Sequence, residues 1–136
     1  SLWTKGAQYV ADAVYFYSDK LGLYPYNHCT AVQSALSAGA GMEYPMITVI
    51  GKSGSAKALE NVILHEVGHN WFYGILASNE RQHPWMDEGM NSYYEYRYLA
   101  EKYPDAKLIG EMANTGIGRA LDLTAYKPSK YLLKCK

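Results

Sequence analysis

The sequence has few cysteines and no excess of charge of either sign. Its 136 residues include only two cysteines, Cys29 and Cys135, which are too few for a disulfide framework and lack the CxxC spacing of a zinc ribbon. The 13 lysines and arginines balance the 13 aspartates and glutamates, so no net field favours binding to nucleic acid. No apolar run approaches the roughly 18 residues of a transmembrane helix, so we expect no membrane segment in this chain.

Internal repeats, low-complexity stretches and blocks of like charge are also missing. Apolar residues make up 49% of the chain and charged residues 19%, which is typical of a globular protein. A chain of this length fits one domain that buries roughly 65–70% of the surface of its unfolded form. We therefore expect residues 1–136 to form a single domain.

Apolar periodicity predicts an α+β fold that is mostly helical. Helices are predicted over 3–21, 56–76 and 86–102, where apolar residues recur at spacings of three and four, and a further helix over 105–113. Strands are predicted over 29–32 and 46–50, and the small residues of 37–41 predict a loop. Because Pro45 cannot donate to a ladder, we expect the second strand at a sheet edge.

The segment His65-Glu66-Val67-Gly68-His69 is an HExxH motif inside a predicted helix. Positions four apart lie about 40° from each other around a helix axis, so both imidazoles project from one face. Two such nitrogens can reach one zinc ion at about 2.0–2.1 Å. Glu66 lies beside this site without having to be a ligand, which suits a general base that takes a proton from water.

A third ligand is expected at Glu88, which is separated from His69 by eighteen intervening residues and lies at the start of the next predicted helix. His65, His69 and Glu88 would form the His₂Glu set of a catalytic zinc site, with one zinc ion per chain. Glu95 lies two turns further along the same helix face, so we expect it to bond the far nitrogen of a ligating histidine. Taken alone, each of these residues is more often a structural or solvated side chain, and only their combination favours a metal.

Three segments, in this order, resemble the signatures of the M1 family of zinc aminopeptidases, which are aminopeptidase N-like gluzincins. The segments are Gly41-Met42-Glu43-Tyr44, His65 to Phe72 and Trp85 to Gly89. The resemblance implies part of a thermolysin-like catalytic domain, with a small edge sheet beside the active-site helix. It also implies that flanking domains of a longer polypeptide accompany this chain.

The resemblance further implies how a peptide is held. Glu43 would bind the free α-amino group of the peptide. The backbone of Gly41 and Met42 would line the site next to it and pair with the peptide. The segment departs from the family's Gly-Ala-Met-Glu-Asn pattern at Ala40, Gly41 and Tyr44, which affects the expected loop geometry and the preference for the first residue.

Two further points concern the catalytic parts that the family uses. Asp87 stands where an asparagine is usual beside the third ligand. The tyrosine that stabilises the oxyanion in the family is expected beyond Lys136, and Tyr126 and Tyr131 are the nearest substitutes, neither in the expected context.

The combined prediction is a zinc metallopeptidase that removes the first residue from peptides with a free N-terminus. A thermolysin-like endopeptidase would share the zinc ligands but lack the amine anchor. An inactive piece or a peptide-binding module on the same scaffold is the other alternative.

Overall fold

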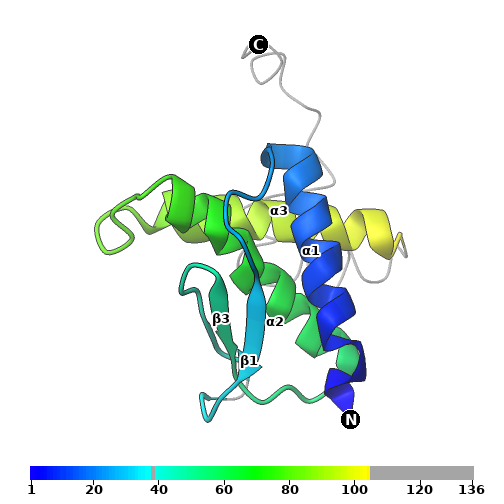
Figure 1. Ribbon diagram of the computed structural model, residues 1–136. Coiled ribbons are helices and arrows are strands. Elements are labelled where there is room, and N and C mark those ends of the chain that lie inside the picture. The colour runs from blue at the N-terminus through cyan, green and yellow to red at the C-terminus, as the bar shows by residue number, and fades with distance from the viewer. Residues whose placement is uncertain (38, 105–136) are drawn as a thin grey trace. The chain divides into compact units, whose positions relative to one another are not determined.

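The computed structural model describes residues 1–37 and 39–104 (Figure 1). The chain divides into two compact units, Ser1–Tyr98 and Leu99–Lys136. Every residue of the site discussed below belongs to the first unit. The helix predicted over 105–113 and the two tyrosines Tyr126 and Tyr131 lie outside the described residues.

The N-terminal helix predicted over 3–21 is confirmed. A short 3₁₀ turn, η1 (Leu2–Lys5), leads into α1 (Gly6–Leu21), which ends at Gly22 with a φ of 112° that favours glycine. The buried residues of α1 are spaced by three and four: Gly6, Tyr9, Ala13 and Tyr17. This spacing keeps these residues on one side of the helix.

A small sheet of three short strands follows, composed of β1 (Thr30–Gln33), β2 (Gly41–Met42) and β3 (Ile47–Ile50). The order is β1-β3-β2, with β1 parallel and β2 antiparallel to β3. Along β3 the buried residues Thr48 and Ile50 alternate with more exposed ones, as expected for a sheet with one covered face.

Two expectations about this sheet were wrong. The strand β3 was expected at an edge but is the central strand, because Pro45 lies in the preceding turn and occupies no ladder position. The end of the predicted loop over 37–41 is instead the start of β2, where Gly41 pairs with Ile50. A strand of two residues is too short to leave an alternating pattern in the sequence.

The long helix predicted over 56–76 is present as two consecutive segments. The helix α2 (Ala56–His69) begins at Ser55, whose hydroxyl accepts a hydrogen bond of 3.1 Å from the backbone N–H of Ala58. Its core-facing side chains are fully buried at intervals of four: Leu59, Ile63 and Val67. The chain then continues in π-helical geometry through η2 (Asn70–Ile75).

The helix predicted over 86–102 is also divided. It starts as the π-helical segment η3 (Trp85–Gly89) and continues as α3 (Met90–Lys102). Such π-helical segments are rare and occur frequently at functional sites. Here one follows the HExxH helix directly, and the other contains the expected third ligand.

The helix α2 is central to the first unit, since it contacts α1 as well as β2 and β3 (Figure 1). Aromatic packing joins the elements, with the ring of Tyr17 in α1 stacked on Trp71 at a centroid distance of 5.4 Å. The predicted mostly helical α+β fold, with a small sheet beside the HExxH helix, is therefore confirmed.

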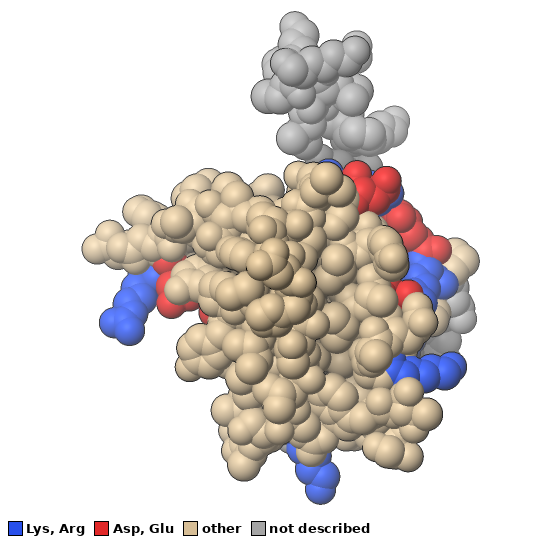
Figure 2. All heavy atoms as spheres, viewed as in Figure 1, with Lys and Arg blue, Asp and Glu red and all other residues tan. Residues whose placement is uncertain are grey.

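The described surface is mostly uncharged on the face seen in Figure 2, where basic and acidic side chains lie mainly along the margin. No helix among residues 1–37 and 39–104 has the length and apolar character needed to cross a membrane.

Candidate metal centre

Two histidines project from one face of α2. The rings of His65 and His69 have centroids 4.8 Å apart and planes at 81°, and their Nε2 atoms are separated by 3.1 Å. The i, i+4 spacing on the helix accounts for this convergence.

Glu88 approaches the same point from η3. Its Oε2 lies 3.2 Å from Nε2 of His65 and 3.7 Å from Nε2 of His69. In a tetrahedral zinc site with metal–ligand distances of about 2.0–2.1 Å, two ligand atoms are separated by about 3.4 Å. The structure thus brings the three expected ligands together with separations that fit one tetrahedral metal ion.

Each histidine is oriented by a carboxylate on its other ring nitrogen. Glu95 Oε2 lies 2.9 Å from Nδ1 of His65, and Asp87 Oδ1 lies 2.5 Å from Nδ1 of His69. When the Nδ1–H group donates a hydrogen bond to a carboxylate, the ring is neutral and the lone pair lies on Nε2. In both histidines this lone pair then faces the point where the three expected ligand atoms converge. Such an arrangement fixes the tautomer and raises the basicity of a metal ligand.

Two asparagine side chains hold Glu95 and the backbone of His65 in place. The second oxygen of Glu95 accepts a bond of 2.8 Å from Asn61 Nδ2, and Asn91 Nδ2 donates a bond of 2.7 Å to the carbonyl oxygen of His65. Gly68 allows this close approach, because a Cβ built on it would overlap Oδ1 of Asn91. The glycine of the HExxH motif therefore has a packing role in this chain.

The two histidines differ in their pKa values in the metal-free chain. Burial lowers the pKa of His65, but the hydrogen bonds that its ring donates to Glu88 and Glu95 outweigh burial and raise this pKa to about 10. Burial and the charge of His65 together lower the pKa of His69 to about 4. Without a metal, the positive charge among the three ligand atoms is therefore a proton on His65, which a divalent ion would replace.

Glu66 is buried beside the pair, with 6% of its surface exposed, and its Oε2 has no hydrogen-bond partner among the described residues. Burial raises the pKa of Glu66 to about 7, with the charge of His65 opposing the shift and that of Glu43 adding to it. Gly41 of β2 covers this carboxylate so closely that a Cβ there would overlap its Oε1. Glu66 is thus a buried acid with one unoccupied acceptor next to the three expected metal ligands.

The expected peptide-binding residues lie at the same place. One carboxylate oxygen of Glu43 lies within 4.8 Å of a ligand atom of both Glu66 and His69. Burial raises the pKa of Glu43, and the charges of Glu80 and Glu88 add to the shift. Met42, the preceding residue in β2, is exposed at 37%.

Three residues of the site were not predicted from the sequence: Glu80, Asp87 and Asn91. Of these, Asp87 has a usable sequence signal, because it is an acid next to an expected metal ligand at the start of a helix. Burial raises the pKa of Asp87 to about 7, with the charges of Glu88, Glu43 and Glu80 adding to the shift.

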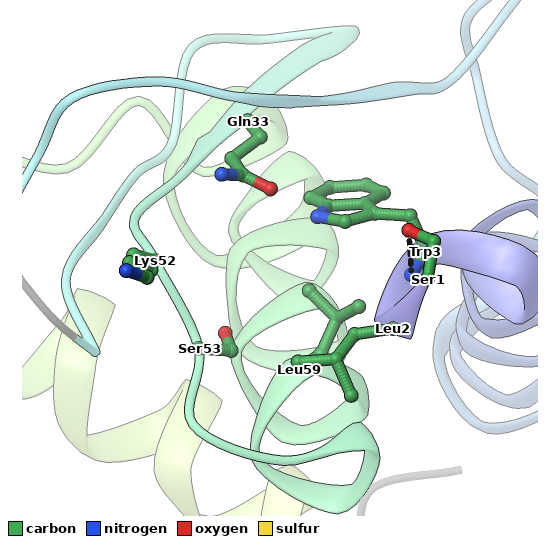
Figure 3. A pocket seen from close by; sticks show the side chains of 7 residues that line it. All are labelled: Ser1, Leu2, Trp3, Gln33, Lys52, Ser53 and Leu59. Atoms are coloured by element: carbon green, nitrogen blue, oxygen red, sulfur yellow. Dashed lines mark hydrogen bonds between the residues drawn. The ribbon is translucent and has the colours of Figure 1, made fainter.

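A separate cavity of about 200 Å³ contains none of these residues. Figure 3 shows its lining, which comes from η1, the end of β1, the loop before α2 and α2 itself: Ser1, Leu2, Trp3, Gln33, Lys52, Ser53 and Leu59. It offers no carboxylate or imidazole, so it is not part of the metal centre.

Two histidines on one helix, a glutamate from the next helix and an unpartnered acid beside them define the chain as a metallopeptidase domain of the HExxH class. The described fold agrees with a part of such a domain. The chain belongs to peptidase family M1, because the model of the peptidase family M1 domain matches residues 8–133.

The curated proteins similar to this chain include several enzymes named leucine aminopeptidase 2. That of Emericella nidulans is 41% identical over 69 residues, covering 46% of this chain and 11% of the relative. Those of Aspergillus niger and Aspergillus clavatus are 37% and 36% identical over 68 and 73 residues, covering 48% and 52% of this chain. The matches span only 11% of the length of these two relatives, and no solved structure matches the chain significantly.

Proposed function

We propose that this chain carries the catalytic centre of a zinc-dependent aminopeptidase with a thermolysin-like, gluzincin fold. The observation that supports this most directly is the convergence of His65, His69 and Glu88, whose three ligand atoms are separated by 3.1, 3.2 and 3.7 Å. The donor set of two imidazoles and one carboxylate suits zinc and leaves a fourth position for chemistry.

The metal and Glu66 have separate tasks in this proposal. Bound by the three ligands, zinc supplies a Lewis acid that polarises a peptide carbonyl and makes water more acidic. Glu66 takes a proton from the attacking water through its unpartnered Oε2 and returns it to the leaving amine. A pKa raised to about 7 suits a group that both accepts and returns a proton near neutral pH.

Glu43 provides the argument for an exopeptidase. Its carboxylate lies within 4.8 Å of Glu66 and His69 ligand atoms, so an α-ammonium group bound there belongs to the residue whose carbonyl meets the metal. The short strand β2 is an edge strand of the described sheet, so backbone groups of Gly41 and Met42 can pair with an extended peptide.

The test compares a short peptide with its N-acetylated form, using the zinc-loaded protein and Glu66→Gln as the inactive control. An aminopeptidase cleaves only the free peptide, and acetylation abolishes turnover. Equal cleavage of both forms would indicate the thermolysin-like endopeptidase. Bound zinc and peptide without cleavage of either form would indicate a binding module, and both outcomes contradict the proposal.

A further inference from the structure

A group of three acids adjoins the proposed amine anchor. Glu43, Glu80 and Asp87 each place one carboxylate oxygen within 4.8 Å of those of the other two, and we call this group the acidic pocket. Glu43 directly follows β2, Glu80 lies in the loop between η2 and η3, and Asp87 belongs to η3. A turn fixes that loop, since the backbone N–H of His83 donates to the carbonyl of Asn79 at 2.8 Å.

Asp87 is the strongest indication that the acidic pocket binds a ligand. Its side chain is only 1% exposed, and one oxygen, Oδ1, accepts a hydrogen bond from His69. The other oxygen, Oδ2, is buried and has no hydrogen-bond partner among the described residues. A buried carboxylate oxygen without a partner, beside two further carboxylates, is stabilised by a bound cation with hydrogen-bond donors.

The size of the acidic pocket suits an ammonium group. An ammonium nitrogen has three donors, and acceptors placed about 2.9 Å from it in tetrahedral directions are separated by about 4.7 Å. The three carboxylate oxygens lie within 4.8 Å of one another, so one ammonium nitrogen can contact all three.

Its position favours an ammonium group over a second divalent ion. Asp87 is hydrogen-bonded to His69, which is itself an expected zinc ligand, so a second divalent ion would lie close to the first and be repelled by it. An ammonium group carries half that charge. Glu43 also belongs to the cluster with Glu66 and His69, so a molecule whose amine occupies the acidic pocket reaches the catalytic carboxylate.

We propose that Glu80, together with Glu43 and Asp87, binds the primary ammonium group of the substrate, which makes Glu80 a specificity residue. This inference rests on the proposed aminopeptidase function, because it assigns a second carboxylate to the amine that Glu43 binds. The same three carboxylates would bind any ligand that presents a primary ammonium group next to the metal centre.

The experiment measures binding without turnover. Zinc-loaded wild-type protein is titrated calorimetrically with 3-methylbutylamine, which has a primary amine and no scissile bond, and with its neutral N-acetyl derivative. The same titrations use Glu80→Gln, the conservative variant Glu80→Asp, Glu43→Gln and the control Asp19→Asn. Asp19 is an exposed acid on α1, paired with Lys20, so its replacement removes one negative charge away from the site.

The expected result is that wild type and Asp19→Asn prefer the amine, and that Glu80→Gln binds it about 10- to 100-fold more weakly, as the loss of one charge-assisted hydrogen bond implies. Glu80→Asp should recover part of the affinity, and the zinc content should be the same in all variants. Binding of the N-acetyl derivative should not change.

Three results would overturn the inference. Equal amine binding by wild type and Glu80→Gln, with weaker binding by Glu43→Gln, removes Glu80 but leaves the proposed aminopeptidase intact. Equal binding of the amine and its N-acetyl derivative by wild type refutes the amine anchor and the proposed function together. Calcium or magnesium binding that Glu80→Gln abolishes and that displaces the amine would make the acidic pocket a metal site.

Discussion

Gly41→Ala tests how closely β2 packs against the proposed catalytic carboxylate. An alanine Cβ at this position would overlap Oε1 of Glu66 and lie 2.5 Å from its Cγ. Gly41 is paired with Ile50 of the central strand, and Glu66 is 6% exposed, so neither partner can move away without cost. Overpacking of this kind destabilises a protein by about 1–3 kcal/mol. A catalytic group displaced by about 1 Å typically loses about 100-fold in rate.

The assay combines urea unfolding, zinc analysis and hydrolysis of an amino-acid anilide by the zinc-loaded protein. Gly54→Ala is the matched control, because a Cβ built there meets no atom within 4 Å. We expect Gly41→Ala to lower both stability and rate while retaining zinc, and Gly54→Ala to change neither. In a Glu66→Ala background the stability cost of Gly41→Ala should become smaller, since the overlapping side chain is absent. Equal costs in both backgrounds, or no loss of stability at all, would refute the packing argument.

Three further predictions concern the support and the charge of the centre. Gly68→Ala should destabilise the fold by about 1–3 kcal/mol in urea unfolding, because its Cβ would overlap Oδ1 of Asn91; unchanged stability would contradict this contact. Asp87→Ala removes the acceptor for Nδ1 of His69 and should weaken zinc binding about 10- to 100-fold in chelator competition, whereas unchanged affinity would show that Asp87 does not orient the ligand. Since the pKa of His65 is raised to about 10 in the metal-free chain, its ring is protonated at neutral pH, and zinc must displace that proton. Calorimetry in buffers of different ionisation enthalpy should detect release of about one proton, with affinity rising up to about tenfold per pH unit between pH 6 and 9; pH-independent affinity would contradict the assignment.

The convergence of the expected metal ligands could be predicted from the sequence because its signals are local. His65 and His69 are four residues apart on a helix with an apolar periodicity of its own, which fixes their common face. Glu88 and Glu95 follow on one predicted helix, and the structure places Glu88 at the histidine pair and Glu95 on Nδ1 of His65. Their roles as zinc ligand and as support for the first histidine remain predictions.

The remaining features depend on contacts between distant segments. The strand β2 has two residues and is defined only by its pairing with β3, so no periodicity in the sequence could predict it. The central position of β3 follows from strands on both of its sides, which a proline outside the ladder does not reveal. Glu80 joins the site only because its loop folds towards Glu43, and a lone acid in a loop carries no such signal.

Zinc analysis of the purified protein and of Glu88→Ala, by mass spectrometry and X-ray absorption, tests the convergence of the three ligands most directly. We predict one zinc ion per wild-type chain, with two nitrogen donors and one carboxylate oxygen from the protein at about 2.0–2.1 Å. Glu88→Ala should bind zinc at least about 100-fold more weakly, because loss of a direct ligand exceeds loss of an orienting group. Unchanged stoichiometry and affinity in Glu88→Ala would contradict the assigned metal centre.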